Sequence, residues 1–80
     1  MQQYTATFHT HLSAMMSERS LKKSGFSARM APVPRSLSSS CGTCVFYEAD
    51  GPHEELLDED WESVYLQTGA RYDKLLQNSD

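Results

Sequence analysis

No apolar run in this 80-residue sequence approaches the roughly 18 residues that a membrane-spanning helix needs. The first residues also lack the basic segment followed by an apolar stretch that marks a secretory signal peptide. Only two cysteines are present, and no internal repeat is visible. We therefore expect no membrane partner, and a cytoplasmic protein whose thiols are kept reduced.

The length limits the protein to one small domain, residues 1–80. A chain this short buries only about 60% of its unfolded surface, so it supports a single thin core. With 39% hydrophobic residues it is nevertheless too apolar to be wholly disordered. We expect the core to span about residues 3–68, with a C-terminal tail over 69–80.

The net charge of −4 hides a strong asymmetry along the chain. Up to Arg35 there are five basic residues and one acidic residue, whereas ten acidic and two basic residues follow it. The acidic segment 54–62 argues against nucleic acid as a partner. It is typical of the solvated face of a short helix, and a docking surface for a basic partner is the alternative.

The pattern of β-favouring residues, helix caps and turns predicts six elements. Strands are expected at 4–8, 26–33, 43–48 and 63–67, and helices at about 11–24 and 53–60, with a frayed helical turn over 71–77. Thr10 is the predicted N-cap of the first helix and Gly25 follows its end. The order β-α-β-β-α-β predicts an α+β, ferredoxin-like split βαβ fold, an antiparallel sheet with its helices on one face.

This fold predicts which residues meet. Its first and third strands are central antiparallel neighbours, so Phe8 and His9 should lie beside Thr43 and Cys44, with the start of the first helix near Cys41. The expected apolar face of that helix is formed by four residues: Leu12, Met15, Met16 and Leu21.

Alternation places Cys44 on the same face of its strand as Phe46, which we take as the core face. On that basis packing is slightly favoured over a chemical role for Cys44, because a free cysteine packs as a small apolar residue.

The segment from Pro32 to Cys44 is the most informative part of the chain. Prolines remove backbone donors and serines compete for backbone hydrogen bonds, so a buried strand is disfavoured here. What this segment offers is a loop of N–H groups, hydroxyls and a guanidinium around a thiol. We predict that the loop holds an anion beside Cys41 through five residues: Arg35, Ser38, Ser39, Ser40 and Gly42.

Cys41 is the candidate reactive thiol, because the thiolate is the nucleophile and a helix N-terminus or a cation favours it. Cys44, three residues on, is a candidate resolving thiol. His9 and His11 are candidate bases for Cys41. Alternatively, the two histidines and the two cysteines form a tetrahedral zinc site; otherwise no metal or cofactor is expected.

Residues 4–46 resemble a small bacterial domain family described as selenium/sulfur carrier protein-like. The resemblance lies in the Phe8-His9 ending of the first strand, a helix closing on Gly25, and the residues Pro32-Val33-Pro34-Arg35 leading to Ser39-Ser40-Cys41-Gly42. It implies a carrier that holds sulfur or selenium on Cys41 as a persulfide or perselenide, and that exchanges it with partner proteins. Such a protein is an accessory more than an enzyme with turnover of its own.

Two other functional classes remain open at this point. One is a protein-interaction module, such as a homodimer, in which the two cysteines are structural or bind zinc. The other is a small dithiol redox protein, which requires a reversible Cys41–Cys44 disulfide.

Overall fold

The computed structural model describes residues 1–79. It contains five strands, one α-helix and one short 3-10 turn: β1 (Gln2–Phe8), α1 (His11–Lys23), β2 (Ser27–Pro32), β3 (Thr43–Ala49), η1 (Glu54–Leu56), β4 (Trp61–Thr68) and β5 (Arg71–Gln77). The described helices include none that is long and apolar enough to cross a membrane.

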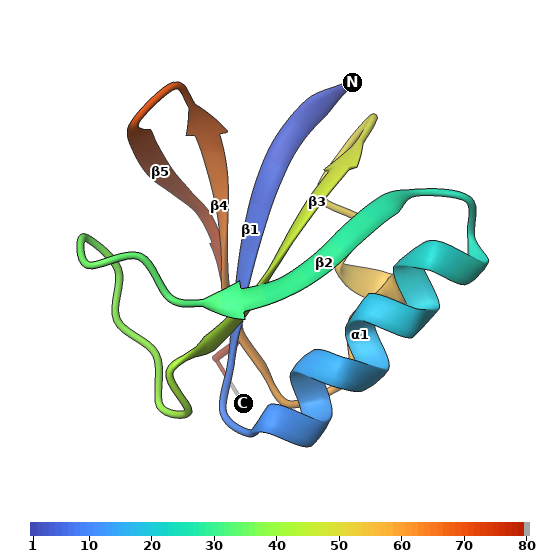
Figure 1. Ribbon diagram of the computed structural model, residues 1–80, viewed down its shortest axis with the longest axis horizontal. Helices are drawn as coiled ribbons and strands as arrows, with labels where there is room; N and C mark the ends of the chain where they lie inside the picture. The colour runs from blue at the N-terminus through green and yellow to red at the C-terminus, as the bar shows by residue number, and fades with distance from the viewer. Residues whose placement is uncertain (80) are drawn as a thin grey trace.

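The strands form one antiparallel sheet in the order β2-β3-β1-β4-β5 (Figure 1). The first four have the order of a ferredoxin-like sheet, with β1 and β3 as central neighbours. Thr7 of β1 pairs with Cys44 of β3, so the predicted meeting of these two strand ends is confirmed. The α+β, ferredoxin-like class is confirmed, and β5 extends the sheet by one strand.

The helix α1 packs against β1, β2 and β3 on one face of the sheet (Figure 1). Thr10 caps it as expected, because its side-chain oxygen accepts a hydrogen bond from the Ser13 N–H. Gly25 follows with φ of 92°, a conformation that favours glycine after a helix end. The core beneath the helix is made of fully buried apolar residues, of which the largest are Phe8, Leu21, Val45 and Val64.

The expected apolar face of α1 is wrong in part. Leu12 and Met16 are 58% and 47% exposed, whereas the buried residues of this helix are Ser13, Ala14, Ser17 and Leu21. Small residues on the buried stripe allow the helix to lie close to the sheet. The buried hydroxyl of Ser17 is fully hydrogen-bonded: it donates to the Ser13 carbonyl and accepts from the Asp58 N–H, both at 2.8 Å.

The predicted second helix over 53–60 does not form. Only η1 is helical there, and it follows His53, whose φ of 48° is left-handed. In an α-helix, Glu54 would face Asp58 and Glu55 would face Glu59, and such like-charge pairs destabilise a helix. The chain instead folds irregularly toward β4.

The predicted helical turn over 71–77 is also wrong, because this segment is strand β5, paired with β4. It adds an outer strand to the side of the sheet away from β2. One residue of β5, Leu75, has no partner in the register and is 45% exposed, which marks a bulge in this edge strand.

The other edge of the sheet is strand β2, and part of it is blocked. The Met30 N–H donates to the Glu18 carboxylate of α1 at 3.1 Å. Two residues further along, Pro32 has no N–H to offer. A free strand edge exposes donors and acceptors that pair with other chains, and here two adjacent outward positions are closed to that pairing.

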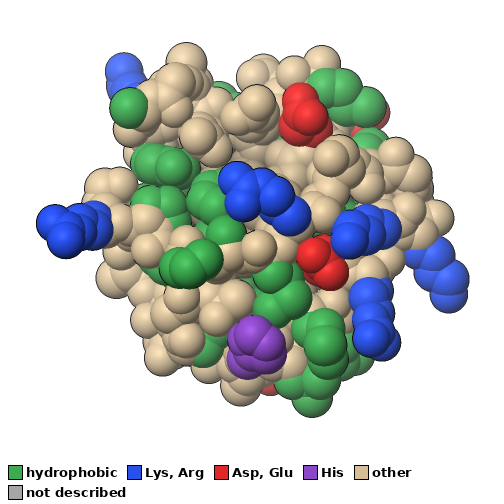
Figure 2. All heavy atoms as spheres, in the orientation of Figure 1, with side chains coloured by type: hydrophobic (Ala, Val, Ile, Leu, Met, Phe, Trp, Pro, Cys, Tyr) green, Lys and Arg blue, Asp and Glu red, His purple; other side chains and the backbone are tan. Residues whose placement is uncertain are grey.

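Most of the basic residues of the first half of the chain lie on α1, β2 and the loop after β2. Basic side chains are scattered over the face formed by β2 and α1, with few acidic ones among them (Figure 2). This agrees with the basic residues of the first half of the chain, which lie on these elements and on the loop after β2.

Candidate functional site

Cys41 lies at the end of the ten-residue connection between β2 and β3, residues 33–42. Two backbone hydrogen bonds shape this loop: the Leu37 N–H donates to the Pro34 carbonyl, and the Val33 N–H donates to the Gly42 carbonyl. Gly42 has φ of 73°, where a side chain is strained. The loop therefore turns sharply directly after Cys41 and enters β3.

The loop is fastened to the junction between β1 and α1. The Ser39 hydroxyl donates to the Phe8 carbonyl at 3.0 Å, and the Ser40 hydroxyl lies 3.4 Å from His9 Nδ1. On the other side of Cys41, the Thr43 hydroxyl lies 3.4 Å from His11 Nδ1. The predicted approach of this loop to the start of the first helix is thus reproduced in the structure.

The Cys41 thiol is half-buried and packs against the edge of the core. Its Sγ donates to the Thr43 carbonyl at 3.6 Å and lies 3.9 Å from the Ser39 hydroxyl. Cys41 is therefore partly exposed to solvent, with its sulfur bordered by Thr43 and Ser39.

Cys44 has a different environment, although it is only three residues away. Its side chain is fully buried, and Sγ donates to the Pro32 carbonyl at 3.7 Å. Burial raises the pKa of the Cys44 thiol to about 11; Arg29 lowers it partly and Cys41 raises it further. Cys44 does share a face with Phe46, but this is the face without the helix, so the expectation that it is the main core face is wrong.

Glu62 holds the loop through Ser40. Its carboxylate accepts the Ser40 N–H at 3.0 Å and the Ser40 hydroxyl at 2.7 Å, and it lies 3.4 Å from His9. The position arises from a bulge: Thr7 pairs with Ser63, and Phe8 pairs with Trp61, so Glu62 is the extra residue. Bulges re-aim side chains in this way.

The electrostatics of Glu62 follow from these contacts. Burial on its own raises the pKa of this carboxyl, but the hydrogen bonds from the Ser40 side chain and backbone outweigh burial, with further help from Ser39 and His9. The net result is a pKa below the ordinary value, so Glu62 is a carboxylate at neutral pH. The Ser40 donors that were predicted to hold an external anion are therefore already bound to an internal one.

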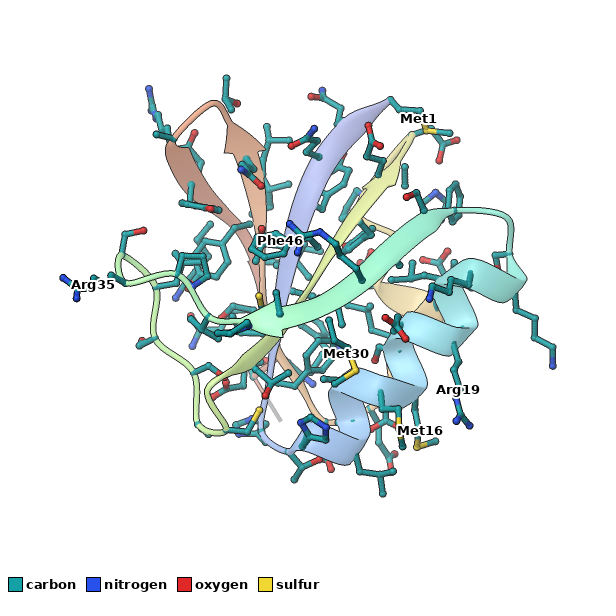
Figure 3. All side chains as sticks on the ribbon, viewed as in Figure 1. Met1, Met16, Arg19, Met30, Arg35 and Phe46 are labelled. Carbon is teal, nitrogen blue, oxygen red and sulfur yellow. The ribbon has the colours of Figure 1, made fainter. Side chains whose placement is uncertain are left out.

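The structure does not bring Arg35 to Cys41. Arg35 is exposed, and its side chain extends from the loop away from the rest of the protein (Figure 3). Ser38 is exposed, Ser39 faces Cys41, and Ser40 faces Glu62. Of the side chains predicted to hold an anion, only that of Ser39 has a described polar contact with the Cys41 sulfur, and Gly42 forms the turn directly after Cys41.

The structure does not bring the two candidate histidines to the two cysteines. His9 contacts Ser40 and Glu62, and His11 contacts Thr43; within residues 1–79 neither imidazole is hydrogen-bonded to Cys41. Across the same residues, no group of three or more His, Cys, Asp or Glu side chains is placed to hold a metal ion. The arrangement does not fit a zinc site at these two histidines and two cysteines.

Taken together, the fold and the site define a small ferredoxin-like α+β domain that carries one partly exposed cysteine on a tethered loop. The sequence matches the model of the family described as "Putative Se/S carrier protein-like" over residues 3–59. This match covers most of the chain, including both cysteines, and the protein belongs to that family. Neither a curated protein nor a solved structure matches the chain.

Sequence reasoning missed two polar residues of this region. Glu62 was counted with the acidic segment, and no pattern in the sequence signals the bulge that turns it toward Ser40. Thr7 was counted as an ordinary strand residue, but its hydroxyl is buried without a hydrogen-bond partner among the described residues. A threonine near the end of a central strand is the only sequence signal that it leaves.

Proposed function

We propose that this protein is a carrier that holds one sulfur or selenium atom on Cys41 and exchanges it with protein partners. The observation that carries the proposal is the contrast between its two thiols: Cys41 is accessible on a tethered loop, and Cys44 is fully buried. Membership of a carrier family supports the same function.

Loading is a transfer between two sulfur atoms with no net oxidation. The Cys41 thiol loses its proton, and the thiolate attacks the outer sulfur of a persulfide on the donor protein. The S–S bond of the donor breaks and its thiolate leaves, while a new S–S bond forms on Cys41. Delivery is the reverse step with an acceptor nucleophile, and selenium follows the same course.

The residues around Cys41 have distinct parts in this proposal. Ser39 is a positioning residue: its hydroxyl donates to the Phe8 carbonyl, and its oxygen lies 3.9 Å from Sγ, so it fixes the loop directly beside the thiol. Ser40 and Glu62 hold the loop in place, which limits the freedom of the thiol to swing away. Arg35, exposed on the same loop, is better placed to meet a partner protein than to bind the thiolate.

The dithiol alternative receives less support from the geometry. A resolving thiol must attack as a thiolate, and the buried Cys44 with its raised pKa is a poor nucleophile at neutral pH. The zinc-binding alternative lacks a gathered set of ligands among residues 1–79.

The test is the intact mass of the protein after incubation with a donor protein that bears a persulfide. We expect a gain of one sulfur atom that reductant reverses. The Cys41→Ser variant should show no gain, and the Cys44→Ala variant should gain as the wild type does. A sulfur found on Cys44, or a loss of two hydrogens in place of a gain, would contradict the carrier function.

A further inference from the structure

A mostly apolar hollow of about 290 Å³ lies at the β2 edge of the sheet, beside the loop that carries Cys41. Its walls come from the start of α1, the end of β2 and the two residues that follow Cys41; they are His11, Met30, Ala31, Pro32, Gly42 and Thr43. In Figure 3, Met30 extends from β2 toward α1. Met30 and Cys41 both pack against the core on the helix side of the sheet, so the hollow opens next to the candidate thiol.

The polar groups around this hollow are largely occupied by other parts of the protein. The Met30 N–H donates to a carboxylate of α1 at 3.1 Å, the Gly42 carbonyl accepts a backbone N–H at 3.1 Å, and the Pro32 carbonyl accepts from a buried thiol. The side chains of His11 and Thr43 lie 3.4 Å apart and contact each other. An occupant of the hollow therefore gains most by burying apolar surface.

The same contacts indicate the shape of the occupant. A strand that extended the sheet here would find the Met30 N–H taken and no N–H on Pro32. The volume also lies at the lower limit of the about 300–1,000 Å³ that small-molecule sites enclose. The hollow suits a single apolar side chain of another protein better than an added strand or a whole cofactor.

The charges around the hollow indicate what flanks that side chain. Residues 11–35 include five basic residues and one acidic residue, Glu18. Glu18 is already engaged, because its carboxylate accepts the Met30 N–H and lies 3.6 Å from Lys22 Nζ. Figure 2 shows basic side chains spread over this face, with hydrophobic ones between them. Since complementary charges guide two proteins to each other, the matching surface carries carboxylates.

We propose that this hollow is the docking site for the protein that exchanges sulfur or selenium with Cys41, and that this partner presents an apolar side chain flanked by carboxylates. The apolar side chain enters between α1 and the end of β2, and Lys22 faces the carboxylates. Docking there brings the reacting atom of the partner to Cys41, because Gly42 belongs both to the loop and to the hollow. The proposal rests on the carrier function, which defines the partner.

Disulfide exchange with short peptides tests this surface without any persulfide. Each peptide carries a cysteine activated as its 2-pyridyl disulfide: the Cys41 thiolate attacks the peptide sulfur, the old S–S bond breaks, and pyridine-2-thiolate leaves as a chromophore. One peptide has a leucine flanked by glutamates; in two controls, serine replaces the leucine or lysines replace the glutamates. Each rate is divided by the rate of the 2-pyridyl disulfide of mercaptoethanol with the same protein, so a change in the thiol itself cancels.

We expect the leucine–glutamate peptide to react about tenfold faster or more than either control peptide, because burial of a leucine side chain contributes at least that much. Intact mass and peptide mapping should place the added peptide on Cys41.

Variants on the two edges of the sheet locate the surface. Met30→Glu and Pro32→Glu each put a carboxylate into the hollow, the second at an exposed position, and both should abolish the advantage of the leucine–glutamate peptide. Leu75→Glu alters a 45% exposed residue of the opposite edge strand and should retain the advantage. Lys22→Glu should reduce the preference for glutamates over lysines, whereas Arg71→Glu on β5 should not.

Equal relative rates for the three peptides would overturn the proposal, as would an advantage that persists in both variants of the hollow. Binding to phosphatidylserine vesicles that is lost in Met30→Glu would assign the hollow to a membrane surface and overturn it as well. A peptide preference without any sulfur gain from a persulfide donor would contradict the carrier function and support the docking surface. A sulfur gain with equal peptide rates would do the reverse.

Discussion

The two faces of the sheet are both buried at their centre, but by different means. On the face covered by α1, apolar residues such as Phe8 and Val45 pack together. On the other face, the buried residues include Thr5, Thr7 and Ser63, and two of these hydroxyls have no partner within residues 1–79. The difference shows that one sheet can be buried by apolar packing on one face and by packed polar residues on the other. The helix face holds the fold together, and the helix-free face tolerates unsatisfied polar groups beside the loop of Cys41.

The largest expected effect is on the helix face. Phe8→Ala removes a fully buried ring from the centre of the core, and we expect it to reduce the free energy of unfolding by about 3–5 kcal/mol. Urea denaturation of the two proteins measures this loss. A loss of less than 1 kcal/mol would mean that the apolar face does not dominate stability, and the comparison between the faces would fail.

The second prediction uses Cys44 to test how dry the helix-free face is. Burial raises the pKa of its thiol from 9.0 to about 11, so between these values the folded protein keeps a proton that the unfolded chain has lost. Stability from this group is therefore intact below pH 9 and is lost as the pH rises toward 11, by at most about 2–3 kcal/mol.

The matched control is Cys44→Ala, which removes this titration. Tyr47, whose pKa burial also raises, titrates in both proteins, so it cancels in the difference between them. The stability of the wild type relative to the variant should fall from pH 9 to pH 11 in denaturation curves. A constant difference across this range would show that the Cys44 environment is not desolvated.

The third prediction concerns the two hydrogen bonds by which Ser40 and Glu62 clamp the loop to β4. Glu62→Gln replaces the acceptor of two Ser40 hydrogen bonds, and we expect a loss of about 1 kcal/mol with faster exchange of the Ser40 amide hydrogen. Because the pKa of Glu62 is lowered, its stabilisation is present at neutral pH and is lost as the pH falls through that pKa. An unchanged exchange rate for Ser40 would contradict the clamp.

The smallest expected effect has the opposite sign. Thr5→Val and Thr7→Val each exchange an unpaired buried hydroxyl for a methyl group, and we expect stability to stay level or to rise by up to about 1 kcal/mol. Thermal denaturation measures this change. A clear loss in Thr5→Val would indicate that the hydroxyl on this face is satisfied, and the contrast between the two faces would be weaker than we describe.

Much of the fold is predictable because local signals and topology agree. Thr10 has the chemistry of a helix cap, and the strands alternate clearly enough to give the order with β1 beside β3. The helix predicted for the acidic segment was wrong. Turn residues and a proline favoured a helix there, but two features oppose it: the carboxylates repel one another, and His53 has a left-handed backbone conformation. The edge strand β5 depends on pairing with β4, and such a tertiary contact leaves little local pattern.

The site was predictable at the level of the loop and not at the level of its contacts. Proline, serine and glycine indicated a rigid loop around Cys41, and that loop is present. The partner of Ser40 was not predictable, because Glu62 reaches it through a one-residue bulge that depends on the register between two distant strands. Arg35 was predicted to lie beside Cys41 because the two are close in the sequence, but its side chain extends away from the rest of the protein.

The carboxylate of Glu18 on the edge of β2 has a consequence for how this protein meets others. The outward N–H of Met30 is occupied, and Pro32 has none, so a neighbouring chain cannot easily add a strand along this edge. In Figure 3, Met30 lies on this edge near α1, and Met16 lies further along the helix. We therefore expect contacts along this edge to be made through side chains, which disfavours the strand-to-strand pairing from which fibres grow.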